Sequence, residues 1–171
     1  MNKKGLKYFD HEKRFDGTYA SYNQSKNASA LNSKNFPPAF FSIVSLFAED
    51  ANYNLREVCL MNGCLSIQGL YQGQKNTLYL RYKYNEDITL VVAQVAFIHK
   101  RKGYMTRLYE ILCNIKKVYK LNEIIIECAN TNEIKNWCNK NGLVKMPNNK
   151  YNYISKDGYN RLIKKGYKKI Y

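Results

Sequence analysis

The stretch that decides the fold is ITLVVAQVAFIHKRKGYMTRLYEILCNIKKVY, residues 88–119. Its first part is nearly all apolar from Ile88 to Ile98, as expected for a strand that is covered on both faces. Between its two parts stands HKRKG, with three consecutive positive charges and a glycine. Its second part carries apolar residues at helical spacing, at Met105, Leu108, Ile111, Leu112, Ile115 and Val118. The stretch therefore predicts a strand, a basic loop and a helix in direct succession.

The segments before this stretch predict the first half of a sheet. CLSIQGLY (64–71) and TLYLRYKY (77–84) are rich in β-branched, aromatic or aliphatic residues. The turn-forming segments QGQKN and NED separate these runs from each other and from the strand that begins at Ile88. Because the links are short, we expect an antiparallel meander.

The segments after it predict the second half. NEIIIECAN (122–130) has the composition of a buried strand, and YNYIS (151–155) that of a further strand. NEIKNWCNKNG (132–142) predicts a short helix closed by Gly142 in a left-handed conformation. A strand–helix–strand crossover favours parallel pairing of its two strands. The predicted fold class is therefore mixed α/β, with an antiparallel meander followed by a parallel crossover in one central sheet.

The length of 171 residues suggests one domain, with different character at its two ends. Residues 1–35 are polar and lack periodicity, so we expect an arm or a lid beside a domain that spans residues 36–171. FPPAFFSIVSLFAED (36–50) predicts a helix that begins near Pro38. The basic tail KDGYNRLIKKGYKKIY (156–171) either ends in a short helix or frays.

The charge of the chain points to an anionic partner. Lys and Arg number 28 against 13 Asp and Glu, which gives a formal net charge of +15. Such an excess suits nucleic acid, a phosphorylated cofactor, an acidic protein or a membrane surface. The alternative is a base composition rich in A and T, which accumulates Lys, Asn, Tyr and Ile codons. The charge alone does not choose among these.

Several classes of protein are disfavoured. The 5 cysteines form no CxxC pair and the chain has only 2 histidines, so a metal centre and a secreted disulfide framework are both poorly supported. No signal peptide opens the sequence, and no apolar run approaches the roughly 18 residues that a membrane span needs. We therefore expect a cytoplasmic protein that does not bind membranes.

The HKRKG segment is a candidate phosphate site. A helix N-terminus exposes unpaired backbone N–H groups and carries a partial positive charge. Gly103 would let the backbone turn tightly and let a ligand approach, while Lys100, Arg101 and Lys102 would add charge. The alternative is an ordinary strand-to-helix loop with solvated lysines.

In its context, HKRKGYMTRLYEIL resembles the acyl-CoA-binding motif of the GNAT acetyltransferase superfamily. In that family a strand feeds a loop of pattern Q/R-x-x-G-x-G/A, which opens a helix and holds the pyrophosphate of coenzyme A. Lys100 falls on the Gln/Arg position, Gly103 on the first small residue and Met105 on the second. Lys100 and Met105 depart from the pattern, although Lys100 keeps the charge and the Met105 backbone N–H remains.

The downstream segment IIIECANTNEIKNWCNKNGL follows the order that is usual in the family: a buried strand, a turn with Asn, and a short helix. Trp137 and Cys138 fall on its aromatic positions, and Gly142 with Leu143 on its Gly-Phe pair. The likeness covers roughly residues 65–155. It implies that the strand 91–98 splays from residues 124–128, which opens a V for the pantetheine arm.

The resemblance implies acetyl-CoA as the ligand and acyl transfer from a thioester to an amine as the reaction. For Asn130, a plain helix cap at Asn130 or Thr131 is an equal alternative. Trp137 is interpreted as a core residue rather than a substrate platform. The residues that would bind acetyl-CoA are Val95, Ala96, Phe97, Lys100, Arg101, Lys102, Gly103, Tyr104, Met105, Thr106 and Asn130.

Two candidate catalytic residues follow from the same resemblance. Cys138 falls on the position of the tyrosine that protonates the departing thiolate; the alternative is a small packing residue. Glu127 is the nearest carboxylate to the position of a base, shifted by about one residue; the alternatives are a strand-end acid and a chain of waters. Tyr151 and Tyr153 are alternative proton donors.

Two functions are therefore expected from the sequence. The first is an N-acetyltransferase that transfers acetyl from acetyl-CoA to an amine of a macromolecular acceptor, either an acidic protein or one associated with nucleic acid. The second is a basic nucleic-acid- or partner-binding protein that has kept this fold and lost catalysis.

Overall fold

The computed structural model describes residues 21–23, 38–61, 64–84, 88–127 and 129–168. Along the chain the elements are β1 (Ser21–Asn23), α3 (Pro38–Asp50), β2 (Leu55–Met61), β3 (Cys64–Tyr71), β4 (Gln74–Tyr84), β5 (Ile88–Ala96), α4 (Tyr104–Tyr119), β6 (Glu123–Ile126), α5 (Asn132–Lys140), β7 (Leu143–Met146), β8 (Asn149–Ser155) and α6 (Lys156–Lys164).

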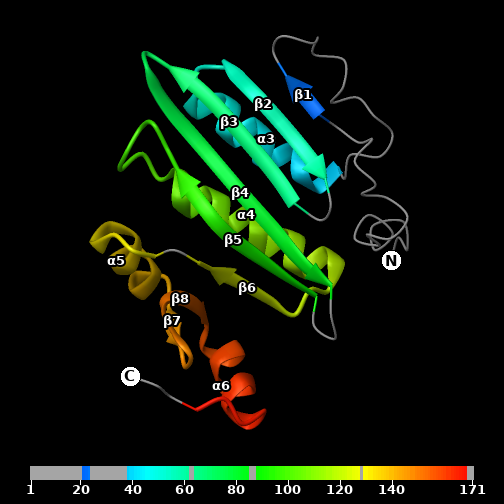
Figure 1. Cartoon of the computed structure of the whole chain (residues 1–171), viewed down its shortest axis with the longest axis vertical. Coiled ribbons are helices and arrows are strands. Elements are labelled where there is room, and N and C mark those ends of the chain that lie inside the picture. Colours follow the sequence, from blue (N-terminus) through cyan, green and yellow to red (C-terminus); the bar gives the residue numbers. More distant parts are fainter. Residues whose placement is uncertain (1–20, 24–37, 62–63, 85–87, 128, 169–171) are drawn as a thin grey trace.

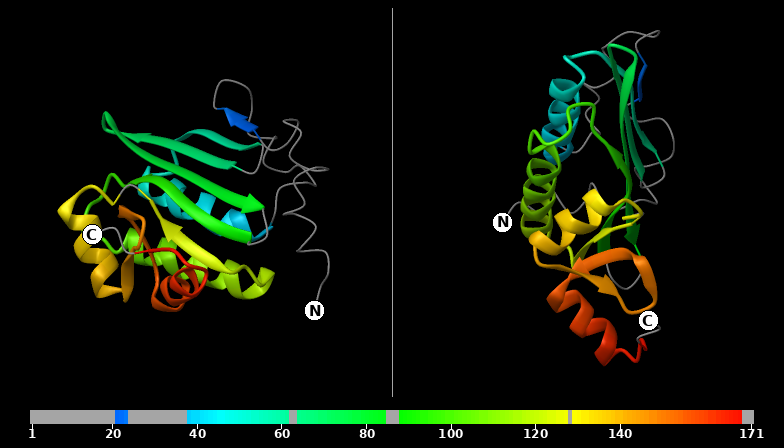
Figure 2. Two further views of the ribbon diagram at one scale, coloured as in Figure 1. Left: turned by 60° about the horizontal axis from the view of Figure 1, so that its bottom comes forward. Right: turned by 90° about the vertical axis from the view of Figure 1, so that its left-hand side faces the viewer.

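The strands form one sheet of 8 strands in the order β1-β2-β3-β4-β5-β6-β8-β7 (Figure 1). From β1 to β5 each strand pairs antiparallel with the next. The pair β5–β6, which the α4 crossover connects, is parallel, and the pairs β6–β8 and β8–β7 are again antiparallel. The predicted fold class, an antiparallel meander followed by a parallel strand–helix–strand unit, is confirmed. The helices α3 and α4 pack against each other and cover one face of the sheet (Figure 2).

The core lies between this face and the two helices. Alternate residues of the central strands point into it, such as Leu90 and Val92 of β5, which are fully buried. On α4 the buried residues are Leu108, Leu112, Ile115 and Tyr119, at the spacing of one helical face. Val118, which the sequence pattern placed on that face, is 54% exposed, and Tyr119 fills the position instead.

Strand β5 changes character halfway along its length. Residues 89–92 are buried and pair with β6. The last pair is Val92 with Ile126, and just beyond it the Glu127 N–H donates a hydrogen bond to the Val92 carbonyl. On the other side, Leu80 pairs with Val92 while Tyr79 pairs with Gln94, so Ala93 is an extra residue. Such a bulge bends a strand. Beyond it, the described residues give β5 no partner on the β6 side, and Gln94 and Ala96 are exposed, so the prediction of a strand covered on both faces is wrong for this half.

Other predictions have mixed outcomes. The helix that begins at Pro38 is confirmed, Gly142 has the predicted left-handed conformation with φ of 72°, and the basic tail forms α6. The strands β1, β2 and β7 were not predicted. Apart from β1, the arm predicted for residues 1–35 lies outside the described residues.

Candidate ligand site at the start of α4

A cavity of about 710 Å³ lies where β5 leaves β6 and meets the first turn of α4; we call it the loop cavity. Two of the predicted ligand residues, Lys102 and Asn130, are exposed and do not line it. Asn130 precedes Thr131, which caps α5 by accepting a hydrogen bond from the Ile134 N–H. All the remaining predicted ligand residues line the cavity: Val95, Ala96, Phe97, Lys100, Arg101, Gly103, Tyr104, Met105 and Thr106. Its remaining wall consists of His99, Thr131, Glu133, Ile134 and Trp137.

The first turn of α4 opens onto this cavity. Gly103 is the N-cap residue, with φ of 79° and ψ of 3°, and no described side chain caps the helix. The first helical bond runs from the Arg107 N–H to the Gly103 carbonyl, so the N–H groups of residues 104–106 have no acceptor within the helix. A Cβ atom on Gly103 would meet no heavy atom within 4 Å. The turn can therefore accommodate an anion.

The basic residues of the loop are not neutralised by the rest of the described chain. No described acid lies within salt-bridge distance of Lys100 or Arg101. The carboxylate of Glu133, on the opposite wall, interacts electrostatically with both cations. Hydrogen bonds from its own backbone N–H and from Thr131, together with these two cations, lower the pKa of Glu133. The cavity is thus bordered by two cations and one ionised carboxylate.

Two acids at the end of α3 hold the loop from both sides. Glu49 accepts two hydrogen bonds of 2.7 Å from the Arg107 guanidinium and one of 3.3 Å from the Tyr104 hydroxyl, and Arg107 chiefly lowers the pKa of Glu49. This bidentate pair fixes the α4 side of the loop to α3.

Asp50 holds the other side. Its carboxylate is fully buried and accepts hydrogen bonds from the backbone N–H of Ile98 at 2.9 Å and of His99 at 3.0 Å. The Asn76 side-chain amide at the start of β4 donates to it at 2.9 Å. The buried carboxylate therefore links α3, β4 and the beginning of the loop.

Aromatic side chains form the apolar walls. Phe97 stacks between Phe47 of α3 and Tyr104 of α4, with ring-centroid distances of 4.8 and 5.5 Å. On the α5 side, the Trp137 indole N–H donates to the Thr106 hydroxyl at 3.1 Å. Trp137 is half-buried and lines the loop cavity, so its position combines packing with cavity formation.

The two candidate catalytic residues do not meet at the loop cavity. Cys138 is fully buried, does not line the cavity, and has its pKa raised to about 12 by burial. Its thiol has no route to a leaving group there, so the packing role fits this position better. Glu127 is partly buried and forms an ion pair with Arg81, also away from the cavity wall.

The alternative donors differ from each other. Tyr151 is exposed, whereas Tyr153 is fully buried and its hydroxyl has no hydrogen-bond partner among the described residues. Burial, followed by the nearby Cys138, raises the pKa of Tyr153. Neither tyrosine lines the loop cavity.

The sequence did not predict roles for His99 or Asp50. They meet across 49 positions of the chain, so no local motif joins them. The available signals were an acid at the end of an apolar helix and a histidine directly before the basic loop.

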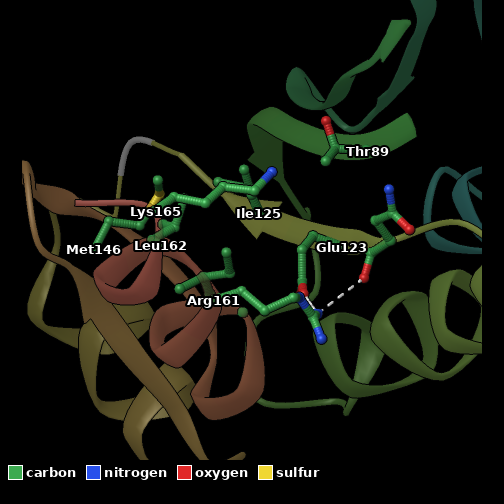
Figure 3. A pocket seen from close by; sticks show the side chains of 10 residues that line it. Thr89, Glu123, Ile125, Met146, Arg161, Leu162 and Lys165 are labelled. Atoms are coloured by element: carbon green, nitrogen blue, oxygen red, sulfur yellow. Dashed lines mark hydrogen bonds and ion pairs between the residues drawn. The ribbon is translucent and has the colours of Figure 1, made fainter. Parts of the chain in front are cut away.

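A second, smaller cavity of about 90 Å³ lies at the start of β6, next to α6 (Figure 3). Glu123 borders it, is 6% exposed, and forms ion pairs with Arg161 and with Lys116, the latter at 3.7 Å. The Ser155 hydroxyl, which also caps α6, donates to Glu123 at 2.9 Å. The cations here are bound by the protein's own acid.

Comparison with known proteins assigns no family. No family model and no curated protein matches the chain. Among the solved structures that match is a chain of the crystal structure of the KacTA-DNA complex, with a TM-score of 0.40 and 10% identity, covering 72% of this chain and 85% of that chain. A likeness this distant carries no information about activity.

Two further features concern only the described part of the chain. None of its helices has the length and apolar character to cross a membrane. No three or more of its His, Cys, Asp and Glu side chains come together in a way that could hold a metal ion.

Proposed function

We propose that the protein is an acyl-CoA-dependent N-acyltransferase that acts on an amine of a macromolecular acceptor, with acetyl-CoA as the donor. The observation that carries this proposal is the loop cavity. The N-terminus of α4, which no described side chain caps, and Lys100 and Arg101, which pair with no described acid, border the opening beside β5. The resemblance of HKRKGYMTRLYEIL to the GNAT motif supports it independently.

The residues present fit acyl-CoA. The backbone N–H groups of residues 104–106, with Lys100 and Arg101, would hold the phosphates, because helix N-termini and cations together suit phosphate. The open space at Gly103 lets the phosphates approach the backbone. The half of β5 after Ala93 leaves main-chain groups on its β6 side for the pantetheine amides. A cavity of about 710 Å³ is within the usual range for small-molecule sites.

When bound, acyl-CoA would supply an acyl group on a thioester, so that a C–N bond replaces the C–S bond and the amine proton ends on the coenzyme A sulfur. The chain contributes binding and orientation of the two reactants, which can supply much of a rate enhancement. A backbone N–H of β5 beyond the bulge would stabilise charge on the thioester oxygen.

The direct test is calorimetric titration with acetyl-CoA. Wild-type protein should bind, and Gly103→Asp should lose about 100-fold or more in affinity, because a carboxylate beside the phosphates costs several kcal/mol. Gly166→Asp is the matched control: Gly166 also has positive φ, 90°, with no atom within 4 Å of an added Cβ, but follows α6. The proposal fails if wild type does not bind acetyl-CoA, or if Gly103→Asp binds as well as Gly166→Asp.

A second candidate function is nucleic-acid binding. Between residues 140 and 168 the only acid is Asp157, and Tyr151 and Tyr167 are exposed beside the cations. Interleaved cations and aromatic rings suit single-stranded nucleic acid. The exposed cations of this segment are Lys140, Lys145, Lys150, Lys156, Arg161, Lys164, Lys165 and Lys168.

This second function is separable from the first by its salt dependence. Affinity for a fluorescent single-stranded oligonucleotide should fall steeply with salt, and replacing Lys145, Lys150 and Lys164 by Ala should reduce the slope by about one per lost phosphate contact. Acetyl-CoA binding should be the same in that triple variant. A salt slope that the triple variant leaves unchanged would exclude this surface.

A further inference from the structure

The Asp50–His99 contact determines which imidazole nitrogen carries the proton. The Nδ1 atom of His99 lies 3.0 Å from the Asp50 backbone carbonyl oxygen and 3.2 Å from its carboxylate Oδ1. Both of these oxygens can only accept a hydrogen bond. Nδ1 must therefore be the protonated nitrogen, and Nε2 is left without a described partner.

His99 forms part of the cavity wall, and Asp50 lies behind it. The Asp50 side chain is fully buried, whereas the His99 side chain is 40% exposed and lines the loop cavity. Since Nδ1 faces the buried carboxylate, the exposed edge of the ring carries Nε2. Asp50 itself is held in place, because Asn76 and the backbone N–H groups of Ile98 and His99 all donate to it.

We infer that Asp50 is a positioning residue that directs His99 Nε2 into the loop cavity, where the imidazolium binds the phosphates of the ligand together with Lys100 and Arg101. The identity of the ligand rests on the proposed function; the position of His99 does not. Histidine ordinarily changes charge between about pH 5 and 8, and only the protonated ring has a donor on Nε2 as well as Nδ1. Ligand affinity should then contain a component that is present only while the ring is charged.

Several elements of the described chain place titratable or charged groups near His99. From α3 the Asp50 carboxylate faces it, whereas the Glu49 carboxylate is engaged by Arg107 and Tyr104. From β3 the Tyr71 ring lies with its centroid 5.9 Å from that of His99. Lys100 and Arg101 follow it in the loop, and the Glu133 carboxylate on α5 faces those two cations.

The test compares wild type with His99→Asn between pH 5.5 and 8. The Asn amide nitrogen can take the place of Nδ1 and keep the bond to Asp50, so the variant loses only Nε2. We expect wild type to bind coenzyme A about tenfold more tightly at pH 5.5 than at pH 8 beyond any change seen in His99→Asn. The phosphates of the ligand titrate alike with both proteins and cancel in this difference. Pantetheine, which lacks the phosphates, should bind both proteins equally.

A second measurement tests the positioning without any ligand. Long-range proton–nitrogen NMR of the unliganded protein at pH 8 should show His99 protonated on Nδ1, and the signal is assignable because the chain has only 2 histidines and His99→Asn removes one. Protonation on Nε2 would overturn the inference. So would identical pH profiles for wild type and His99→Asn with coenzyme A.

Inorganic pyrophosphate separates this inference from the proposed function. If pyrophosphate binds with the His99-dependent pH profile while acetyl-CoA does not bind, His99 is a phosphate-binding group and the acyltransferase proposal is wrong. If acetyl-CoA binds but His99→Asn changes nothing, the acyltransferase proposal stands and this inference is wrong. If neither ligand binds at any pH, both are wrong.

Discussion

The surroundings of Asp50 and of Glu123 use the same device with opposite results. Each is a buried acid that holds elements distant in sequence, and each has at least one basic side chain among its described partners. Around Glu123 the donors are Arg161, Lys116 and the Ser155 hydroxyl, so Arg161 and Lys116 are neutralised internally. The cavity beside them measures about 90 Å³.

Asp50 instead receives backbone N–H groups, the Asn76 amide and His99, and it pairs with no lysine or arginine of the described ranges. Lys100 and Arg101 are left facing a cavity of about 710 Å³. The difference shows that the partners of a buried acid decide whether nearby positive charge stabilises the fold or remains available to a ligand.

Replacing the two acids by their amides should give the largest effects. Asp50→Asn turns a pure acceptor into a group with one acceptor oxygen and a donor, which strands several buried donors; we expect a loss of about 3–5 kcal/mol in the free energy of unfolding. Glu123→Gln keeps the Ser155 bond and should cost about 1–3 kcal/mol. Urea unfolding measures both, and coenzyme A affinity should fall only in Asp50→Asn. Equal losses of affinity in the two variants would contradict the distinction.

Removing one cation from each region should affect different properties. Lys100→Ala should weaken coenzyme A binding about tenfold with little change in stability, since it removes a charge-assisted phosphate contact. Arg161→Ala should lower stability without changing that affinity. Lys117→Ala, on the exposed last turn of α4, is the control for charge alone. An equal loss of affinity in all three would mean that net charge, not the loop, binds the ligand.

Helix α5 borders both the loop cavity and the core: its Trp137 lines the cavity, whereas its Cys138 is buried. Burial raises the pKa of Cys138 from its ordinary 9.0 to about 12. The folded protein then holds the thiol proton between about pH 9 and 12 while the unfolded chain releases it, so this stability is complete below pH 9 and is lost as the pH rises towards 12.

In that window the free energy of unfolding should fall by up to about 1.4 kcal/mol per pH unit more in wild type than in Cys138→Ala. Burial also raises the pKa of Tyr109 to about 12; most of this contribution is common to both proteins, and the smaller part that comes from Cys138 adds to the difference between them. Iodoacetamide labelling followed by mass spectrometry should modify the exposed Cys113 well before Cys138. Rapid labelling of Cys138 in the folded protein would place its thiol within reach of the cavity.

The smallest effect is expected at Glu133. Its carboxylate is the acid that faces Lys100 and Arg101, so Glu133→Gln should strengthen coenzyme A binding, by less than about tenfold because the group is exposed. The gain should shrink in high salt. Weaker binding in this variant would indicate that Glu133 contacts the ligand itself.

Much of the fold was predictable because the decisive signals are local. The apolar run of β5, the helical spacing on α4 and the left-handed Gly142 are each visible within a few positions. The strand β2 was missed because Arg56 and Glu57 interrupt its apolar residues, which pack on one face only. Strand β7 has only 4 residues and is at the edge of the sheet.

For the site, the loop residues were predictable and their supports were not. Periodicity indicates that α5 is a helix but does not fix its rotation, so the sequence could not decide which of Trp137 and Cys138 faces the cavity; Trp137 lines it and Cys138 is buried. The Asp50–His99 contact depends on how α3 docks onto the sheet, which no short segment encodes.

Helix α3 contributes no side chain to the wall of the loop cavity, yet its last two residues secure both ends of the loop. We therefore expect ligand binding at the loop cavity to depend on α3, although α3 lines no part of that cavity. Partial detachment of α3 would abolish binding while the strands stay paired, and a bound ligand would in turn slow hydrogen exchange of the α3 amides. The local opening equilibrium of α3 would then set how much of the population can bind.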